Sequence, residues 1–535
     1  MADEDQLPAK RTGLGVLLGT GILAGLIAAL LMSFVFILLR NVFGIATPSE
    51  LIGDRVASAL PVDKFLKLLS TAGGYNQLKQ LGFASAIVGQ LVVGGLGGLL
   101  YAFIVERARA KAPDQTGRFG TNRSGLLFIA FFVIALWLVS LLMLWPVLGT
   151  HYRGLPPSPA TLINAAALLI SYAICGVALI IFYGLITRPE PLRHPSPDNR
   201  PTARRAVLVA GAGAVIAVGL GALLRRLYNQ ATFSYDGTKY LGTDLQFITP
   251  NDKFYVVTKN VIDPRVERGN WQLEITGMVD RSRVYRFEDL TALPAVTQET
   301  TLMCISNEVD GGLMSNAAWK GVPLRSLIEA AGPHAGVKEV FLHGVDNYSD
   351  SFSIEKAMEP TTLVVYEMNG EPLPERHGYP VRVIVPGLYG EKNVKWVTRI
   401  ELVDHDAKGF YERQGWGPNF VIATHSRIDA PDLSKPVSRG TVVPLKGVAF
   451  AGDRGVSRVE VSTDGGRSWQ DAKITMPGTR LTWAFWIYDW QPGQAGEHKL
   501  MVRATDGKGE LQPSQERGTV PQGATGYYKI KARVV

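Results

Sequence analysis

The feature that most constrains the fold of this chain is a series of five long apolar runs within its first 225 residues. A helix needs roughly 20 apolar residues to cross a hydrocarbon core that is about 30 Å thick. After these runs, short apolar stretches alternate with Gly, Pro and Asp turns. The chain is therefore predicted to join a transmembrane α-helical bundle, within a membrane region at residues 1–230, to a globular part. The expected transmembrane helices lie near residues 13–39, 82–105, 125–148, 162–186 and 206–224.

The first apolar run is too long for a secretion signal, which has a single short apolar region, so we interpret it as a true membrane span. The segment that follows, residues 49–70, mixes apolar and charged side chains. It fits an amphipathic helix in the membrane interface, and an external cap is the plainer alternative.

Basic residues gather after the second and the fourth expected spans. The positive-inside rule places both loops in the cytoplasm. With five spans, the N-terminus is then inside and the chain after Leu224 is outside. We therefore expect the cytoplasmic membrane of a prokaryote, with the globular part on the extracytoplasmic side. The basic residues concerned are Arg107, Arg109, Lys111, Arg118 and Arg123 in one loop, and Arg188, Arg193, Arg200, Arg204 and Arg205 in the other.

The pair Arg204-Arg205 leads directly into the Gly- and Ala-rich fifth span. One interpretation is a topology anchor at a cytoplasmic helix end. The other is a twin-arginine export signal, which suits a protein that folds around a cofactor before it crosses the membrane. No small-residue cleavage site follows convincingly, so we expect an uncleaved anchor.

All eight histidines lie outside the expected spans, and the chain has no Cys-x-x-Cys-His motif. Because intramembrane haem needs axial ligands that are usually histidines, we expect no built-in haem. The bundle is then an anchor, a scaffold or a partner-docking surface. The basic clusters lack interleaved aromatic residues, so we expect no nucleic-acid partner.

Cys304 is one of only two cysteines, and the other, Cys175, lies within an apolar run. A lone thiol is usually a small buried apolar residue. Several stretches further along the chain change this interpretation, and together with Cys304 they resemble the sulfite oxidase family of molybdopterin enzymes. They are Trp319-Lys320-Gly321-Val322-Pro323-Leu324, Tyr366-Glu367-Met368-Asn369-Gly370-Glu371-Pro372-Leu373-Pro374, the run from His377-Gly378-Tyr379-Pro380 to Gly387, and Asn393-Val394-Lys395-Trp396.

The globular part is predicted to contain two domains. Over residues 236–423, strands are interrupted by short helical stretches, which indicates an α+β fold; the resemblance implies that this is the molybdopterin-binding catalytic domain. Residues 424–535 are almost all strand, which indicates a small immunoglobulin-like β-sandwich. Its stretches 459–469 and 502–506 resemble the family's C-terminal dimerisation domain, so the resemblance implies a homodimer through this sandwich.

The resemblance also implies a set of site residues. Cys304 corresponds to the family's molybdenum ligand, and a soft thiolate suits that metal. Alone, Arg382 would fit a strand-edge ion pair and Lys395 an exposed charge; in this company we interpret both, with His377, as ligands of a molybdopterin and its phosphate. The other cofactor-binding residues implied are Phe254, Tyr255, Asn307, Asp346, Asn393 and Val394, and Trp416 stands where the family has its active-site tyrosine.

Other positions depart from the sulfite-consuming members of the family. Glu308 and Val309 stand where those enzymes carry arginine. A carboxylate in place of a guanidinium disfavours a dianion, which argues against sulfite as the substrate. Lys259 and Lys320 are the candidates for a compensating positive charge.

Three hypotheses for function follow. The first is a membrane-anchored, extracytoplasmic molybdopterin oxidoreductase that performs two-electron oxygen-atom transfer on a small molecule and exchanges electrons with a separate redox partner, a cytochrome or a membrane electron carrier. The second is a methionine sulfoxide reductase of the same superfamily. The third, from another class, is a non-catalytic membrane-anchored binding or assembly module. Cys304, His377, Arg382 and Lys395 together argue against the third.

Overall fold

A computed structural model describes residues 14–57, 60–61, 64, 67–68, 71–72, 75–111, 122–149, 152–187, 201–230 and 242–535. The chain forms two compact units. The first unit comprises Met1–Val56, Thr71–Tyr152 and Pro156–Ala231. The second comprises Ala57–Ser70, Arg153–Leu155 and Thr232–Val535.

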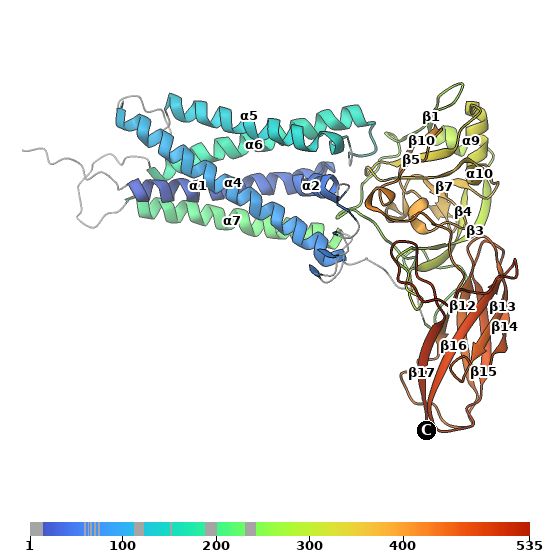
Figure 1. Cartoon of the computed structure of the whole chain (residues 1–535). Coiled ribbons are helices and arrows are strands. Elements are labelled where there is room, and N and C mark those ends of the chain that lie inside the picture. The colour runs from blue at the N-terminus through green and yellow to red at the C-terminus, as the bar shows by residue number, and fades with distance from the viewer. Residues whose placement is uncertain are drawn as a thin grey trace, which may run out of the picture. The chain divides into compact units, whose positions relative to one another are not determined.

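The first unit is a bundle of long helices that lie alongside one another (Figure 1). Within the described residues, five helices are long and apolar enough to cross a membrane, and each corresponds to one predicted span. The helices are α1 (Leu14–Phe43), α2 (Pro48–Ala57), α4 (Tyr75–Lys111), α5 (Arg123–Leu144) followed by the short η1 (Trp145–Val147), α6 (Pro157–Thr187) and α7 (Pro201–Gln230).

Glycines let α1 and α4 pack closely in this bundle. A Cβ atom on Gly25 would lie 2.1 Å from the carbonyl oxygen of Gly94, and one on Gly98 would lie 2.1 Å from that of Gly21. Gly21 and Gly25 are four residues apart in α1, and Gly94 and Gly98 are four residues apart in α4. This is the small-xxx-small pattern that lets helix backbones approach each other in a membrane. Any larger residue at these positions would force the two helices apart.

The predicted features that flank the spans are only partly described. In the segment 49–70, α2 ends at Ala57, and most of the remainder lies outside the described residues. Of the basic residues predicted after the second span, Arg107, Arg109 and Lys111 lie in the last turns of α4 and Arg123 begins α5, whereas Arg118 is outside the described residues. After the fourth span, residues 188–200 are also outside them. Arg204 and Arg205 belong to the N-terminal part of α7.

The second unit begins with two five-stranded sheets and three short helices. This architecture agrees with the predicted α+β fold. One sheet has the order β2 (Arg283–Arg286), β1 (Gln272–Gly277), β10 (Val397–Val403), β5 (Glu339–Gly344) and β6 (Ser349–Ser353), with β1 and β10 parallel. The other has the order β3 (Val296–Met303), β4 (Met314–Pro323), β7 (Leu363–Met368) and β8 (Glu371–Pro372), and β9 (Arg382–Ile384) also pairs with β7. The helices are α8 (Phe287–Thr291), α9 (Leu324–Ala331) and α10 (Ile354–Met358).

The helix α9 shows how the sequence specifies this packing. Its buried residues Leu324, Leu327, Ile328 and Ala331 recur at helical spacing and place one apolar stripe against the core of the first sheet. The helix ends at Gly332, whose φ of 72° is left-handed. Short 3-10 turns, η3 (Glu375–His377), η4 (Gly390–Lys392) and η5 (Glu412–Gln414), follow further along the chain.

The C-terminal strands form one antiparallel sheet of seven strands that encloses its own core (Figure 1). The immunoglobulin-like sandwich predicted for residues 424–535 is not confirmed, because the hydrogen-bonded path runs through all seven strands and gives a barrel-like sheet. The order is β11 (His425–Ala430), β12 (Val443–Phe450), β15 (Ala484–Trp490), β14 (Gln470–Met476), β13 (Val456–Ser462), β16 (Gly496–Asp506) and β17 (Tyr528–Val534).

Candidate active site

A cavity in the second unit gathers residues from distant parts of the chain. Its lining comes from residues 254–259, 302–306, 346–348, 376–396 and 411–416. It contains about 830 Å³ of space, its opening to solvent included.

All but one of the predicted site residues line this cavity. The exception is Asn307, which lies outside the lining and instead braces the turn that carries Cys304. The residues that line it are Phe254, Tyr255, Cys304, Asp346, His377, Arg382, Asn393, Val394, Lys395 and Trp416.

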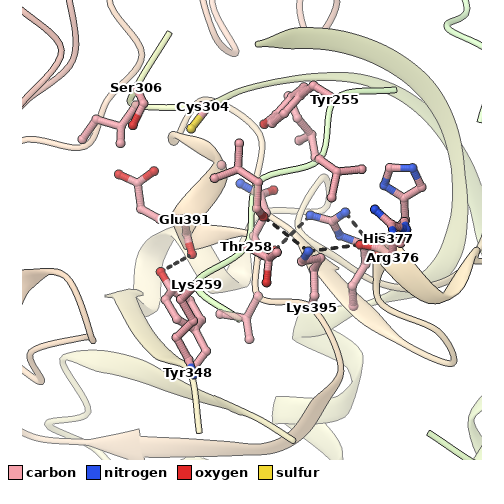
Figure 2. Close-up of a pocket in the computed structure, with 18 of the residues that line it drawn as sticks. Tyr255, Thr258, Lys259, Cys304, Ser306, Tyr348, Arg376, His377, Glu391 and Lys395 are labelled. Atoms are coloured by element: carbon pink, nitrogen blue, oxygen red, sulfur yellow. Dashed lines mark hydrogen bonds between the residues drawn. The ribbon is translucent and has the colours of Figure 1, made fainter. Parts of the chain in front are cut away.

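Cys304 sits immediately after β3 in a tightly braced turn. Its backbone N–H donates to the carbonyl oxygen of Leu313 at 3.0 Å, and its own carbonyl oxygen accepts from the backbone of Asn307. The side-chain oxygen of Asn307 accepts from the Leu313 N–H at 2.7 Å. Cys304 is buried and forms no disulfide. These contacts fix the direction of its thiol, which points into the cavity (Figure 2).

Arg382, the first residue of β9, places a buried guanidinium against the cavity. It donates to the carbonyl oxygens of His377 at 3.2 Å and Asn393 at 3.0 Å, and it stacks over the ring of Trp319. Its Nε has no hydrogen-bond partner among the described residues. Burial lowers the pKa of this guanidinium to about 10. A buried cation with a vacant donor favours an anionic ligand.

Lys395 adds a second buried cation. Its Nζ donates to the carbonyl oxygen of Arg376 at 3.0 Å, and the carbonyl oxygen of Val257 lies 3.4 Å away. Burial lowers the pKa of Lys395 to about 8, and the nearby guanidinium of Arg382 lowers it further, whereas Asp263 and Asp346 oppose the shift. Arg376 also lines the cavity, so three cations converge on this end of it.

His377 lies beside these cations as a neutral imidazole. Burial lowers its pKa to about 3, and the charges of Arg382 and Lys395 act in the same direction. Its Nε2 is 3.1 Å from the carbonyl oxygen of Asn251, which assigns the ring proton to Nε2 and leaves Nδ1 as an acceptor. The ring of Phe254 packs edge-on against it.

The remaining predicted residues hold the loops around the cavity. Asn393 accepts from the Val385 N–H at 2.7 Å and donates to the carbonyl oxygen of Tyr389 at 3.1 Å. The carbonyl oxygen of Val394 accepts from Val383. Asp346 accepts from Asn260 at 2.8 Å.

The end of the cavity around Cys304 has a different chemistry. Tyr255, Ser306 and Glu391 surround the thiol in Figure 2, whereas Arg376, His377 and Lys395 gather at the other end. Burial raises the pKa of Tyr255, and the proximity of Cys304 raises it further. The indole N–H of Trp416, which also lines the cavity, has no hydrogen-bond partner within the described part of the chain.

Glu391 is a cavity residue that the sequence did not reveal. Both of its carboxyl oxygens are buried, and neither has a hydrogen-bond partner among the residues described. Burial raises its pKa to about 8. In sequence it is one charged residue in the polar stretch Gly390-Glu391-Lys392, which looks like an exposed turn. Only the wide apolar surroundings of this stretch could have suggested burial.

Of the four residues that the sequence analysis connected with the charge of the substrate, one lines the cavity and three lie outside it. Lys259 lines the cavity, where its Nζ lies 3.2 Å from the side-chain oxygen of Asn260. Lys320 is outside the lining and pairs with Glu367 at 2.9 Å. Glu308 and Val309 also lie outside it, and Glu308 is exposed. Glu308 therefore does not face the cavity, and its carboxylate cannot repel a dianion bound there.

The donor set fits a molybdopterin. The buried cations and the vacant Nε of Arg382 suit an anionic phosphate, and the thiol of Cys304 suits a soft metal. No cluster of three or more His, Cys, Asp or Glu side chains in the described ranges could hold a metal by itself. A metal at Cys304 would thus take its other ligands from a bound cofactor.

Two family models match the second unit. The oxidoreductase molybdopterin binding domain matches residues 260–411, and the Mo-co oxidoreductase dimerisation domain matches residues 420–534. The matched part of the chain belongs to the sulfite oxidase family of molybdopterin-dependent oxidoreductases. The sulfite oxidase family match thus covers the cavity and the C-terminal sheet.

Relatives in the sulfite oxidase family include mitochondrial sulfite oxidase of Rattus norvegicus, which is 31% identical over 337 residues, 54% of this chain and 61% of the relative. Inducible nitrate reductase [NADH] 1 of Glycine max is 29% identical over 334 residues, 50% of this chain and 37% of the relative. The chain therefore spans less than two thirds of these relatives. The crystal structure of the sulfane dehydrogenase SoxCD from Paracoccus pantotrophus is similar with a TM-score of 0.49 at 26% identity, over 54% of this chain and 82% of that one.

Proposed function

We propose that this chain is a membrane-anchored molybdopterin oxidoreductase that performs two-electron oxygen-atom transfer beside Cys304. The observation that carries the proposal is a single cavity with the thiol of Cys304 at one end and the cations Arg376 and Lys395 at the other, with Arg382 bonded to the carbonyl oxygen of His377 at that other end. When bound, the cofactor would supply a molybdenum centre that exchanges two electrons. The family match over residues 260–411 supports this choice.

The chain's own residues have separate roles in this function. Arg382 and Lys395 bind the anionic part of the cofactor, because both are cations that line the cavity and Arg382 keeps a vacant Nε donor there. His377 contributes an acceptor that stays neutral across the physiological range. Phe254 and Trp319 pack around these groups and exclude water, which strengthens each charged contact.

The substrate favoured by the cavity is neutral. A doubly negative substrate requires cations near the reacting end. In Figure 2, Arg376 and Lys395 lie away from Cys304, whereas Tyr255, Ser306 and Glu391 lie near the thiol, and Lys259 is the cation of the lining on the Glu391 side. This distribution argues against sulfite more directly than the exposed Glu308 does.

Reduction of a sulfoxide such as methionine sulfoxide is the specific reaction that this end of the cavity favours. The reaction consumes two electrons and two protons, breaks the S–O bond and releases a sulfide and water. The supporting observation is Glu391, whose pKa of about 8 makes it a neutral acid at pH 7.

The proposal also covers the attachment of the protein to a membrane and its protein partners. The five apolar helices support insertion into the cytoplasmic membrane of a prokaryote, with the catalytic unit on the extracytoplasmic side. Electrons would pass to or from a separate redox protein, a cytochrome or a membrane carrier. The dimerisation-domain match over residues 420–534 supports a homodimer.

An anaerobic assay of the purified, molybdenum-loaded full-length protein tests this function. One arm offers methionine sulfoxide with a reduced viologen, and the other offers sulfite with an electron acceptor. We expect turnover of the sulfoxide, its loss in Cys304→Ser, and full activity in the matched control Cys175→Ser, which changes a buried thiol of α6. Turnover of sulfite alone would contradict the neutral-substrate proposal, and silence in both arms would contradict the reaction class.

A further inference from the structure

Glu391 is a buried carboxyl group that no structural contact accounts for. It lies in η4 and lines the cavity at the Cys304 end (Figure 2). Buried carboxyl oxygens are normally paired, because an unpaired one loses its hydration without compensation. Neither oxygen of Glu391 has a hydrogen-bond partner in the described part of the chain. A group placed at this cost in a ligand cavity points to a ligand that completes it.

The neighbouring charges are already paired among themselves. Lys392, the residue next to Glu391, lies 2.6 Å from Asp350 of β6 and 3.3 Å from Glu412 of η5. The hydroxyl of Tyr348 lies 2.8 Å from Asp350 and 3.1 Å from the backbone carbonyl oxygen of Glu391. This buried network therefore holds the backbone of η4 and leaves the Glu391 side chain unpaired.

The effects of these charges on Glu391 can be ordered. Burial raises its pKa most. The nearby N–H of its own backbone, which is not aligned for a hydrogen bond to either carboxyl oxygen, lowers it, as does Lys392, whereas Asp350 and Glu412 raise it. From the cavity side, Tyr255, Lys259 and the thiol of Cys304 line the same space. Burial raises the pKa of Tyr255, so its phenol is neutral at pH 7.

We propose that Glu391 is the acid–base residue of this active site, exchanging a proton with the oxygen atom that is transferred at the Cys304 end. The inference rests on the function proposed above. It assigns a catalytic role to a residue that the resemblance did not mark. A neutral acid at the Cys304 end also distinguishes that end of the cavity from a binding site for an anionic substrate.

The chemistry balances for a sulfoxide substrate. The S–O bond breaks, the sulfur atom remains in the product sulfide, and the oxygen atom leaves as water together with two protons. The two electrons that this reduction consumes would come from the bound molybdenum cofactor, which the redox partner would reduce again. The Glu391 carboxyl supplies one proton and solvent supplies the other, after which solvent reprotonates the carboxylate.

A purely structural role for Glu391 predicts different behaviour. A structural carboxyl would be held by the network of Lys392, Asp350 and Glu412, and its replacement by glutamine would change stability at all pH values alike. A proton-exchanging carboxyl instead changes the pH dependence of the reaction. Two measurements on the full-length, molybdenum-loaded protein separate these possibilities.

The first measurement is infrared spectroscopy of wild type and Glu391→Gln across pH 6 to 10. We expect a carboxylic-acid C=O band in the wild type at pH 6 that disappears as the pH rises through about 8. The band should be absent from Glu391→Gln. The matched control Glu308→Gln replaces an exposed carboxylate outside the cavity and should retain the band.

The second measurement is the pH profile of sulfoxide reduction, normalised to molybdenum content. We expect wild-type kcat to fall above about pH 8, where Glu391 ionises. Glu391→Gln should lose about 10²-fold or more in kcat, with KM little changed and the alkaline limb removed. Glu391→Asp, which keeps a carboxyl group, should recover part of the rate together with a pH-dependent limb.

The outcomes separate the two proposals. Wild-type turnover with an unaltered rate and pH profile in Glu391→Gln would overturn the role of Glu391 and leave the proposed function standing. Absence of a Glu391-dependent acid band at pH 6 would overturn the protonated state on which this role depends. A band without any wild-type turnover would show that the proposed function has failed, and the catalytic role of Glu391 with it.

Discussion

Arg427 of β11 donates from Nη1 to the carbonyl oxygen of Gly311 at 2.8 Å and so ties the C-terminal sheet to the turn that carries Cys304. The same guanidinium pairs through Nε with Asp429 at 2.8 Å, and both side chains are only 3% exposed. Gly311 has no room for a side chain, since a Cβ atom would lie 2.6 Å from the side-chain oxygen of Asn307. The C-terminal sheet thus helps to position the thiol of the candidate site.

Arg427→Met tests this tie. The substitution keeps an apolar side chain but leaves Asp429 buried without its cation, so we expect the free energy of unfolding to fall by about 3–5 kcal/mol. We also expect Cys304 to react faster with a thiol reagent, measured in a Cys175→Ser background so that only one thiol is present. The control Arg458→Met removes an exposed arginine that pairs with Asp471 and should change the free energy of unfolding much less. Equal effects of the two substitutions would show that the burial of Arg427 has no special weight.

Arg382→Lys should empty the cofactor site while the fold survives. Lysine keeps the charge but loses the planar fork that reaches two carbonyl oxygens and stacks on Trp319. A lost charge-assisted hydrogen bond of about 1.5–3 kcal/mol corresponds to roughly 10-fold to 100-fold weaker retention. Molybdenum per protein after extensive dialysis measures this. Arg399→Lys, at a half-exposed arginine outside the cavity, should retain wild-type metal content.

Glu391→Gln should change how stability depends on pH. The pKa of Glu391 is raised from 4.5 to about 8 by burial, so the folded protein binds a proton that the unfolded chain releases between those values. Wild-type stability therefore falls as pH rises through this window, by about 1.4 kcal/mol per unit of pKa at most. Glutamine cannot ionise, so the variant should lose this slope. Thermal unfolding at pH 5 and pH 8 measures the difference.

Glu308→Gln serves as the reference for that experiment, because its carboxylate is exposed and gains little from folding. Its stability at pH 5 and pH 8 should track the wild type. If Glu391→Gln also tracks the wild type, the carboxyl of Glu391 ionises in the folded protein as it does in water, contrary to its burial.

Local patterns in the sequence predicted the membrane spans well, because the length of an apolar run is read directly from neighbouring residues. The helices extend beyond the predicted spans. The run at 82–105, for example, belongs to α4, Tyr75–Lys111, because charged ends of a helix can project past the hydrocarbon core. The sequence pattern marks where the apolar part of a helix begins and ends rather than where the helix does.

The strand order of the C-terminal sheet could not be predicted from the sequence. Alternating residues indicate strands, yet the pairing of β14 with β15, with Ile474 opposite Trp486, joins what a sandwich would separate. This contact depends on non-local hydrogen bonds that no local pattern records. The seven-stranded path therefore had to come from the structure.

In the candidate site, family motifs pointed to Cys304, His377, Arg382 and Lys395, and the structure brings these together. They could not indicate Glu391, which sits in a charged turn that only the surrounding fold buries. The motifs also gave no sign that Asn307 braces a turn instead of lining the cavity. Burial and orientation are properties of the assembled sheets and not of a motif.

The contact between Lys395 and the carbonyl oxygen of Val257 joins residues 138 positions apart in the chain. A chain in which these two segments have not met has not yet assembled the end of the cavity that holds Lys395. A partly folded molecule would therefore stay empty instead of half-loaded, and cofactor content would serve as a gauge of completed folding. Because a ligand that binds only the native state stabilises it, binding of the cofactor would also raise the free energy of unfolding of the completed fold.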